Sequence, residues 1–374
     1  MKRKSILLSC FTVALILMGC SKNNVATQWP WQDPEKPETP ETPETPVEPD
    51  KPVDPNDTEK PTEPEEPSVP DLTVDWTDVS SEYGDLPSYI KVKKSPSKLV
   101  EKNAIAYIAI ADMSKAKFEL WSIDDPENKG TKTPLATPSD IYSSKKSKII
   151  INAGYFYSSG GKNYSSSLAI SESKVYAWNI NYACDDWEKG IMYYPTRAAF
   201  VEDGQGGYQA CWTYYNGNVK KNYIYQSPAD NSWKKQPLQI PDASFPEKAS
   251  DRVPKFAIGG GPLLVKEGKV INSKTQELWD GKSGIMPNEN HPRTAVGYTK
   301  DNKIIFFVCE GRRMTPNVSG LTTGDVAQVM KSIGCVEAIN LDGGGSSCML
   351  VNGKETIKPS DKHQRKVGSI LMLN

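Results

Sequence analysis

An aspartate followed by three glycines stands out near the C-terminal end of the sequence, in INLDGGGSS, residues 339–347. Asp342 ends an apolar run, and Gly343, Gly344 and Gly345 follow it directly. Glycine costs backbone entropy, so three in succession indicate a close approach to the backbone or a need for positive φ. The carboxylate can serve as a nucleophile or base, and successive glycine N–H groups can bind an anion. A tight turn between two strands explains the same residues, and the motif alone leaves both interpretations open.

Three other apolar runs end in a polar residue or in glycine. KIIINAGYF stops at Asn152, KFAIGGGPLL stops at Gly259, and KIIFFVCEGRR is followed by Glu310, Arg312 and Arg313. Continuous β-branched and aromatic runs predict strands that are buried on both faces. Because ligands bind at strand ends in covered sheets, we favour one shared site over four unrelated loops. Such a site would combine an amide, two carboxylates, guanidinium groups and glycine N–H groups in one cleft.

The sequence NHPRTAVGY places His291 and Arg293 just before a further predicted strand. Arginine can hold two phosphate oxygens with parallel N–H bonds, and histidine titrates near neutrality and can transfer a proton. A structural ion pair for Arg293 and a solvent-facing loop position for His291 are the alternatives, and the sequence leaves them open. The chain has only two histidines, His291 and His363, which excludes a histidine-rich zinc site.

An amphipathic helix is expected to hold two of these strand ends in place. GLTTGDVAQVMKSIG predicts it, because apolar residues recur at helical spacing at Val326, Val329, Met330 and Ile333. Thr322 or Thr323 can cap its N-terminus, and Gly334 suits the position after its end. The helix would join strands at 304–309 and 336–341 in a strand–helix–strand unit.

A hairpin and the length of the chain complete the expected architecture. RTAVGYTKDNKIIFFV predicts a hairpin that turns at Asp301 and Asn302. Residues 71–374 are enough for one large domain. We expect the α/β (α+β) class: a single domain built on a mixed, mostly buried β-sheet with few helices, with its site at strand ends.

The middle of this domain is rich in aromatic residues. Residues 176–233 contain four tryptophans and nine tyrosines. Flat aromatic faces stack on sugar rings, yet aromatic side chains more often fill cores and pack across hairpins. We therefore expect core packing for most of them and contact with a sugar for one or two.

The N-terminal residues predict export and attachment to a membrane. Three basic residues at 2–4 precede thirteen largely apolar residues, 6–18, which fit a signal-peptide core and are short for a membrane span. The sequence LMGC at 17–20 resembles the bacterial lipobox, which implies a signal peptide over residues 1–19 and lipid attached to Cys20. We expect the protein to be lipid-anchored in the bacterial cell envelope, with the membrane face left open.

A proline-rich tether is predicted within residues 20–70, after the lipidated cysteine. Prolines recur at every third position from 34 to 70, with one omission at Thr58, and polyproline II has three residues per turn. Residues 33–70 also carry thirteen acidic residues against three lysines. At ~3.1 Å per residue this segment reaches on the order of 100 Å. We expect a stiff, solvated spacer that lifts the domain off the membrane.

Charge and cysteine content bound the remaining function classes. The whole chain has a net charge of −1, and residues 71–374 alone carry +5, which suits an anionic ligand and is too weak to argue for nucleic acid. The five cysteines of the domain are an odd number for an oxidising setting, and no metal-type spacing occurs. The sequence does not show which disulfides they form, if any, among Cys184, Cys211, Cys309, Cys335 and Cys348.

Six segments resemble, in their order along the chain, motifs of the phosphodiester glycosidase family. They are NAGYF (152–156), GGGPLL (259–264), HPRTAVGY (291–298), CEGRR (309–313), GLTTGDVAQVM (320–330) and INLDGGGSS (339–347). The resemblance covers about residues 150–370, and the last motif together with RTAVGY is the most specific part. The family usually has aspartate where Glu310 stands, so the carboxylate is kept with a longer reach.

This resemblance implies a hydrolase that cleaves a sugar-1-phosphodiester, similar to a GlcNAc-1-phosphodiester, at the anomeric C–O bond. A glycan or glycolipid phosphodiester would be the substrate, and the membrane would be contacted only through the N-terminal lipid. Breaking this bond builds oxocarbenium character, which carboxylates stabilise. Because the leaving phosphate monoester is already a good leaving group, neutralising the phosphate matters more than acid assistance.

The expected roles follow from these requirements. Asp342 or Glu310 would act as nucleophile or as base for water, and His291 would donate a proton. Asn152 would orient a sugar hydroxyl or the phosphate. The residues expected to bind substrate or phosphate are Arg293, Arg312, Asn152, Gly343, Gly344, Gly345 and Ser346. No resident cofactor is expected, although a divalent cation is compatible with the carboxylates.

Two other functions fit the same residues. A phosphodiesterase that cleaves P–O would use a metal, held by Asp342, Glu310 and Asn152. A non-enzymatic glycan-binding surface lipoprotein would use the aromatic middle of the domain and the tether. The sequence does not give the sugar, the aglycone, the oligomeric state or the stereochemical outcome, which depends on the separation of two carboxylates.

Overall fold

The structure is a computed structural model that describes residues 72–186, 191–233, 239–280 and 283–374. The predicted signal peptide, Cys20 and the tether lie outside the described residues. Within the described ranges, no helix is both long and apolar enough to cross a membrane. The two α-helices of these ranges are α1 (Pro138–Lys145) and α2 (Thr323–Ser332), and short 3₁₀ turns occur at Ser80–Tyr83 and Gly344–Ser346.

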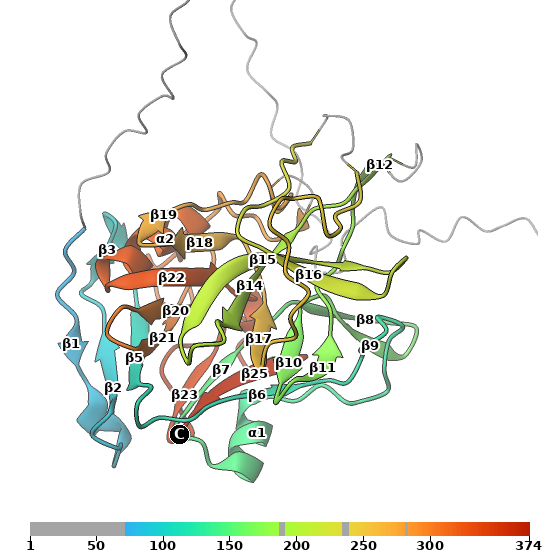
Figure 1. Cartoon of the computed structure of the whole chain (residues 1–374). Helices are drawn as coiled ribbons and strands as arrows, with labels where there is room; N and C mark the ends of the chain where they lie inside the picture. The colour runs from blue at the N-terminus through green and yellow to red at the C-terminus, as the bar shows by residue number, and fades with distance from the viewer. Residues whose placement is uncertain (1–71, 187–190, 234–238, 281–282) are drawn as a thin grey trace, which may run out of the picture.

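Three large β-sheets make up the domain, and three two-stranded ribbons lie beside them (Figure 1). In spatial order the eight-stranded sheet contains β1 (Thr77–Asp78), β2 (Ile90–Lys94), β5 (Ala106–Asp112), β21 (Lys303–Cys309), β20 (Arg293–Thr299), β22 (Cys335–Asn340), β18 (Leu263–Lys266) and β19 (Lys269–Val270). The six-stranded sheet contains β11 (Lys174–Ala177), β10 (Ala169–Ser171), β17 (Phe256–Gly259), β14 (Arg197–Glu202), β15 (Tyr208–Asn216) and β16 (Lys221–Tyr225).

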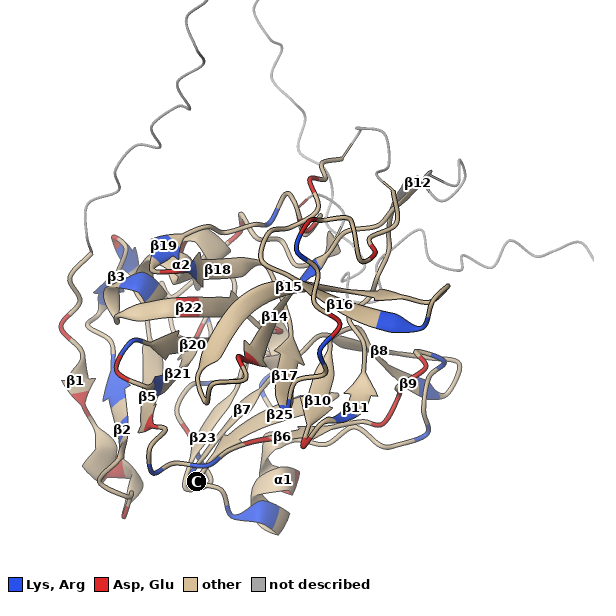
Figure 2. Ribbon diagram, viewed as in Figure 1, with Lys and Arg blue, Asp and Glu red and all other residues tan. Residues whose placement is uncertain are grey.

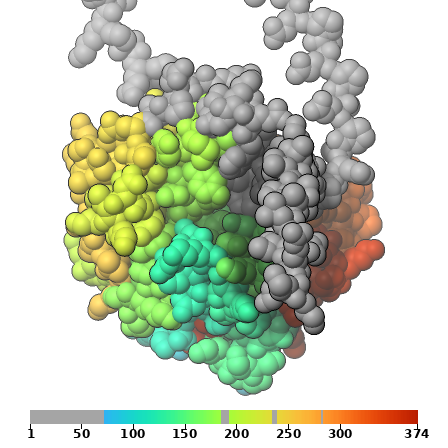
Figure 3. Space-filling view, turned by 90° about the vertical axis from the view of Figure 1, so that its right-hand side faces the viewer, coloured from blue at the N-terminus to red at the C-terminus, as the bar shows by residue number. Residues whose placement is uncertain are grey.

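The five-stranded sheet brings together distant parts of the chain. Its order is β24 (Lys354–Glu355), β23 (Met349–Val351), β7 (Ile149–Asn152), β25 (Ser369–Leu373) and β6 (Phe118–Ser122). The ribbons are β3 (Lys98–Leu99) with β4 (Lys102–Asn103), β8 (Phe156–Ser159) with β9 (Lys162–Ser165), and β12 (Ala183–Asp186) with β13 (Ile191–Tyr193). On the face shown in Figure 3, the teal and green segment that includes β8 and β9 lies below the yellow-green β15–β16 hairpin.

The predicted strand–helix–strand unit is confirmed as β21, α2 and β22, and β20 lies between the two strands in the sheet. β20 pairs antiparallel with both β21 and β22, so these two run in the same direction with β20 between them. β20 and β21 form the predicted hairpin. The side chain of Thr322 caps α2 in a capping box with Asp325, and Gly334 follows its end at a φ of +97°. A sheet-rich domain with few helices confirms the expected fold class.

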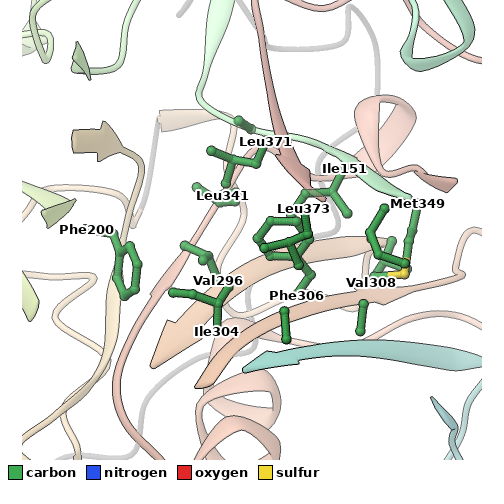
Figure 4. Close-up of a cluster of buried hydrophobic side chains, with 14 of the residues drawn as sticks. Ile151, Phe200, Val296, Ile304, Phe306, Val308, Leu341, Met349, Leu371 and Leu373 are labelled. Carbon is green, nitrogen blue, oxygen red and sulfur yellow. The ribbon is translucent and has the colours of Figure 1, made fainter. Parts of the chain in front are cut away.

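The core lies between the three sheets. One face of the eight-stranded sheet contributes Val296, Phe306 and Val308, which pack against Ile151 and Leu371 of the five-stranded sheet (Figure 4). Phe306 is fully buried there, and its truncation to alanine would cost ~3–5 kcal/mol. The opposite face of the eight-stranded sheet is covered by α2. The sheets are therefore held rigidly together, which fixes the relative positions of their strand ends.

Most described aromatic residues of the middle segment fill the core, as predicted. Trp212, Tyr214 and Tyr225 are buried, while Trp178 and Tyr215 stack on each other with ring centroids 4.7 Å apart.

The charged side chains are mixed in sign. Figure 2 shows Lys and Arg interspersed with Asp and Glu over the described elements.

Candidate active site

A pocket lies where strand ends from the three sheets meet. The N–H of Asp342, after β22, donates to the carbonyl of Ala153, after β7, at 2.8 Å. The N–H of Gly261, after β17, donates to the carbonyl of Asn340 at 2.8 Å, and the Tyr155 hydroxyl donates to the Gly261 carbonyl at 2.7 Å. The structure thus joins three of the four predicted strand ends through direct hydrogen bonds.

The pocket has about 580 Å³ of empty space, which includes open solvent at its mouth. Among the residues predicted for the site, its lining contains Asp342, His291, Arg293, Arg312, Gly343, Gly344 and Gly345. Five further residues line it: Tyr155, Gly284, Ile285, Met286 and Arg365. None of the described aromatic residues from 176–233 lines this pocket. Glu310, Asn152 and Ser346 lie outside its lining.

Asp342 is the carboxylate of the pocket. Burial raises its pKa to about 6, although the Ser346 hydroxyl, the Arg365 charge, the Gly343 N–H and the Arg312 charge all favour its ionised form. Desolvation therefore outweighs the attraction of both arginines. A carboxylate with this pKa is ionised at neutral pH and still basic enough to accept a proton.

Each glycine after Asp342 has a separate structural reason. A Cβ at Gly343 would lie 2.7 Å from the Pro292 carbonyl oxygen, and Gly344 has a φ of +58°. A Cβ at Gly345 would lie 2.2 Å from Nη2 of Arg365. Close approach and positive φ, both expected from the sequence, occur at different glycines of the same motif.

The predicted anion nest is largely occupied by the protein itself. The N–H of Gly344 donates to the Pro292 carbonyl at 2.8 Å, and the N–H of Gly343 hydrogen-bonds the Asp342 carboxylate. Two of the three amides expected to bind phosphate therefore have internal partners. The positive charge of the pocket comes instead from arginine side chains.

Asn152 supports Asp342 from behind. Its Nδ2 donates to the Asp342 main-chain carbonyl at 2.6 Å, while its Oδ1 accepts from Thr294 Oγ1 at 2.8 Å and from the Cys348 N–H at 3.1 Å. The side chain is fully buried. These contacts position the catalytic loop, and they differ from the expected contact between Asn152 and substrate.

Arg293 organises a loop in place of the expected phosphate clamp. Its guanidinium donates to four main-chain carbonyls, at 2.7 to 3.0 Å, those of Leu321, Ile285, Met286 and Glu289. Four of its five N–H donors are therefore used within the protein. Burial lowers the pKa of Arg293, and the side chain is 2 % exposed. It fixes the wall of the pocket that carries Ile285 and Met286.

Arg312 and Arg365 border the glycine motif on two sides. Nη2 of Arg312 lies 3.1 Å from the position of a Cβ at Gly344. Arg312 and Arg313 both have positive φ, at 53° and 57°, a conformation that non-glycine residues adopt only when surrounding contacts impose it. Here the Arg312 and Arg313 N–H groups donate to the carbonyls of Ser319 and Val318, at 3.1 and 2.8 Å.

His291 lines the pocket in its neutral form. Burial, together with the charges of Arg293 and Arg312, lowers its pKa to about 4, against a weaker opposing effect of Glu289. Its Nε2 lies 3.5 Å from Oε2 of Glu289. Because the imidazole is uncharged near pH 7, the expected role as an imidazolium proton donor does not match this environment.

Glu310 follows β21 and does not line the pocket. Its side chain is 2 % exposed, and Oε2 accepts from the Lys358 N–H at 3.3 Å. Its Oε1 is buried without a hydrogen-bond partner among the described residues. Ser346 is also buried, and its hydroxyl hydrogen-bonds Asp342. The structure therefore brings only one of the two predicted catalytic carboxylates to the pocket.

Five lining residues were not predicted from the sequence, and Tyr155 and Arg365 are the two whose side chains matter most for the site. Tyr155 belongs to the NAGYF segment, so its motif was a usable signal. Arg365 stands in KHQRKVGS, which carries no recognisable motif, and only the tertiary fold brings it beside Asp342.

Metal ligands and disulfides were also left open by the sequence. No group of three or more His, Cys, Asp or Glu side chains placed to hold a metal ion occurs in the described ranges. Cys184, Cys211, Cys309, Cys335 and Cys348 are all buried, and no disulfide joins the last four.

The fold and the pocket define a hydrolase-like domain of β-sheets with an arginine-flanked carboxylate, and comparison with known proteins gives its family. Residues 143–374 match the model of the phosphodiester glycosidase family. The chain belongs to this family, as the six motifs of its sequence indicated.

Individual relatives match shorter segments. A prophage-derived Bacillus subtilis protein, YomE, is 37% identical over 87 residues, which are 23% of this chain and 13% of that protein. The mouse N-acetylglucosamine-1-phosphodiester alpha-N-acetylglucosaminidase is 33% identical over 110 residues, 29% of this chain and 20% of the relative. The catalytic domain of the zebrafish enzyme of that name, auto-inhibited by its pro-peptide, matches with a TM-score of 0.49 and 18% identity, covering 81% of this chain and 88% of that structure.

Proposed function

We propose that this protein hydrolyses a sugar-1-phosphodiester at the anomeric C–O bond. The observation that supports this most is the position of Asp342, a pocket-lining carboxylate with Arg312 and Arg365 near it. Hydrolysis at the anomeric carbon needs a carboxylate to assist the oxocarbenium-like transition state and cations to receive the leaving phosphate. Membership of the phosphodiester glycosidase family agrees with this chemistry.

Asp342 would act as nucleophile or as base for water. Ionisation at neutral pH suits both uses, and the contacts from Ser346 and Gly343 orient the carboxylate. Among the described residues that line the pocket, it is the only carboxylate. A phosphate monoester with a second pKa of ~6 leaves without strong acid assistance, so one carboxylate suffices for this reaction. Neutral His291 would position the substrate by hydrogen bonding.

The part of the pocket lined by Tyr155, Ile285 and Met286 would receive the sugar ring. These residues supply apolar surface, and the hydrogen bonds of Arg293 to the carbonyls of Ile285 and Met286 hold that loop in place. Carbohydrate rings have apolar faces that pack against such surface. The name of the mouse relative makes N-acetylglucosamine-1-phosphodiester, carried by a glycan or glycolipid, the first substrate to test.

The decisive experiment follows the oxygen of water. The purified full chain in detergent would be incubated with an α-N-acetylglucosaminyl phosphodiester of methyl mannoside in ¹⁸O-enriched water, and the products identified by phosphorus NMR and mass spectrometry. We expect the label in free N-acetylglucosamine and phosphate retained on the mannoside. Label in the phosphate would instead show P–O cleavage, and loss of turnover in chelator would support the metal-dependent alternative.

Matched variants separate catalysis from binding. Asp342→Asn should lose most turnover while remaining folded, whereas Asp251→Asn removes an exposed carboxylate paired with Lys221 and should behave as wild type. Full turnover in folded Asp342→Asn would exclude Asp342 from the mechanism. Sugar binding without turnover in the wild type would favour a glycan-binding lipoprotein.

We also propose that Cys20 carries lipid and holds the domain at the cell envelope through the tether. The basic and apolar N-terminal segment and the LMGC sequence support this. Labelling of cells with radioactive palmitate should mark the wild type and leave Cys20→Ser unlabelled. Equal labelling of both chains would refute lipidation at Cys20.

A further inference from the structure

Arg365 is held beside the pocket by a dedicated carboxylate. Its Nε donates to Oδ2 of Asp361 at 2.9 Å, and its Nη2 lies 2.7 Å from the same oxygen. Its Nη1 donates to the Ser346 hydroxyl at 3.5 Å. Three of the five N–H donors are thus engaged, and the side chain, which is 40% exposed, lines the pocket.

The glycine motif is shaped around this ion pair. A Cβ at Gly345 would lie 2.2 Å from Nη2 of Arg365 and 2.4 Å from both carboxylate oxygens of Asp361. Real Cβ contacts of this length do not occur, so any side chain at Gly345 would displace the pair. A side chain at Gly345 would therefore move the ends of Arg365 and Asp361 away from their present positions beside the loop that carries Asp342.

Several groups that were expected to bind phosphate have partners within the protein. Arg293 donates to four carbonyls, and the N–H groups of Gly343 and Gly344 have partners within the protein. Arg365 lines the pocket beside Gly345 and is oriented there by Asp361, and its charge favours the ionised form of Asp342. It is therefore a cation well placed to meet a phosphate held next to Asp342.

We propose that Arg365, oriented by Asp361, binds the departing phosphate and favours its doubly charged form. This inference rests on the proposed function. When the anomeric C–O bond breaks, its electron pair stays on the phosphate oxygen, water supplies the new oxygen of the sugar, and one water proton passes to solvent. The phosphate changes from a diester with one negative charge to a monoester with two. A cation fixed at that point stabilises the transition state more than the substrate.

The site should therefore prefer the phosphate monoester product over the diester. A guanidinium that gains a second charge-assisted contact strengthens binding on the order of tenfold to a hundredfold. Arg365 would touch the leaving group directly, whereas Asp361 acts through Arg365 and is a positioning residue. Lysine at position 365 would keep the charge but lose the planar fork that Asp361 holds.

The test compares kinetics with product binding. Arg365→Gln, Arg365→Lys, Asp361→Asn and Gly345→Ala would be assayed with the diester for kcat and KM. Calorimetry with methyl α-mannoside 6-phosphate would measure monoester binding without turnover. Arg252→Gln is the matched control, because Arg252 is similarly exposed, at 36%, and is paired with Glu202 at the end of β14.

We expect Arg365→Gln to lower kcat and weaken monoester binding, each on the order of tenfold to a hundredfold, with KM changed less than threefold. Arg365→Lys should recover part of the loss, and Asp361→Asn and Gly345→Ala should show smaller losses of the same two quantities. Arg252→Gln should match wild type.

Two results would overturn the inference in distinguishable ways. If the wild type cleaves C–O and Arg365→Gln, folded as shown by its melting curve, keeps wild-type kcat and monoester affinity, Arg365 does not bind the phosphate. If the wild type neither cleaves C–O nor binds the monoester, the proposed function fails and this inference fails with it. If Arg365→Gln does not fold, kcat and monoester affinity are measured for Arg365→Lys and Asp361→Asn instead. Wild-type values of both quantities in these two variants would likewise show that Arg365 does not bind the phosphate.

Discussion

Replacing Asp342 with asparagine should stabilise the folded protein while it abolishes turnover. The pKa of Asp342 rises from 3.8 in the unfolded chain to about 6 in the fold, because burial disfavours the carboxylate. A raised pKa means that the folded state prefers the protonated form. Above pH 6 the ionised side chain therefore destabilises the fold, by ~3 kcal/mol for a shift of about two pKa units. Asparagine carries no charge and removes this cost.

The sign of the effect depends on pH, which makes the prediction specific. Below pH 4 Asp342 is protonated in both states, so the wild type and Asp342→Asn should have nearly equal stability. Between pH 4 and 6 the wild type loses stability relative to the variant, and the difference should reach its full size above pH 6. Attraction to Arg365 and Arg312 opposes this effect, but it is weaker than desolvation.

Melting temperatures of both proteins at pH 4 and pH 8 measure this difference directly. Other titrating groups are common to the two chains and cancel in the comparison. Asp251→Asn, an exposed replacement, should show no such pH-dependent gain. A variant that is less stable than wild type at pH 8 would mean that the arginines outweigh burial, and the assignment of Asp342 as a destabilised catalytic group would be wrong.

Three further predictions follow from the neighbours of Asp342. His291→Gln should lose less melting temperature than wild type between pH 6.5 and 4, because a histidine with its pKa lowered to about 4 destabilises the fold as pH falls; parallel pH curves would show that His291 titrates normally. Arg293→Lys should lower the free energy of unfolding by ~3 kcal/mol or more in urea titration, since one ammonium cannot reach four carbonyls; a stable variant with only a raised KM would return Arg293 to phosphate binding. Glu310→Gln should keep kcat within about threefold in the diester assay, because glutamine still accepts from Lys358, and a loss of a hundredfold would restore Glu310 to the chemistry.

The sequence predicted the elements that carry the site better than the side chains that complete it. The run IIIN before Ala153 forms a fully buried strand, as a continuous β-branched run predicts, and the mostly apolar run CVEAIN before Asp342 forms another largely buried strand. The capped helix α2 and the hairpin at Asp301 and Asn302 have strong local signals, and both occur. The existence of three separate sheets had no local signal, because strand pairing between distant segments depends on the tertiary fold.

Side-chain direction explains the remaining differences. Glu310 and Arg312 are two residues apart, yet only Arg312 lines the pocket, while Glu310 is buried and accepts from the Lys358 N–H. Arg293 has the residue type expected for phosphate, but the loop at 285–289 offers it four carbonyls. Arg365 lies far from every motif and reaches Asp342 only through the five-stranded sheet. Which of these side chains lines the pocket depends on neighbours in the folded structure, and the local sequence does not predict those neighbours.

The place of β25 in the five-stranded sheet has a consequence for how the chain is made. β25 pairs with β6 and β7, so residues separated by about 250 positions form adjacent rungs of the core. Such non-local pairing slows folding, because a long loop must close before the contacts form. At ~5–20 residues per second of synthesis, roughly 12 to 50 seconds separate the appearance of β6 from that of β25. We expect the nascent chain to remain unfolded during that interval, and to need chaperones that bind its exposed apolar strands.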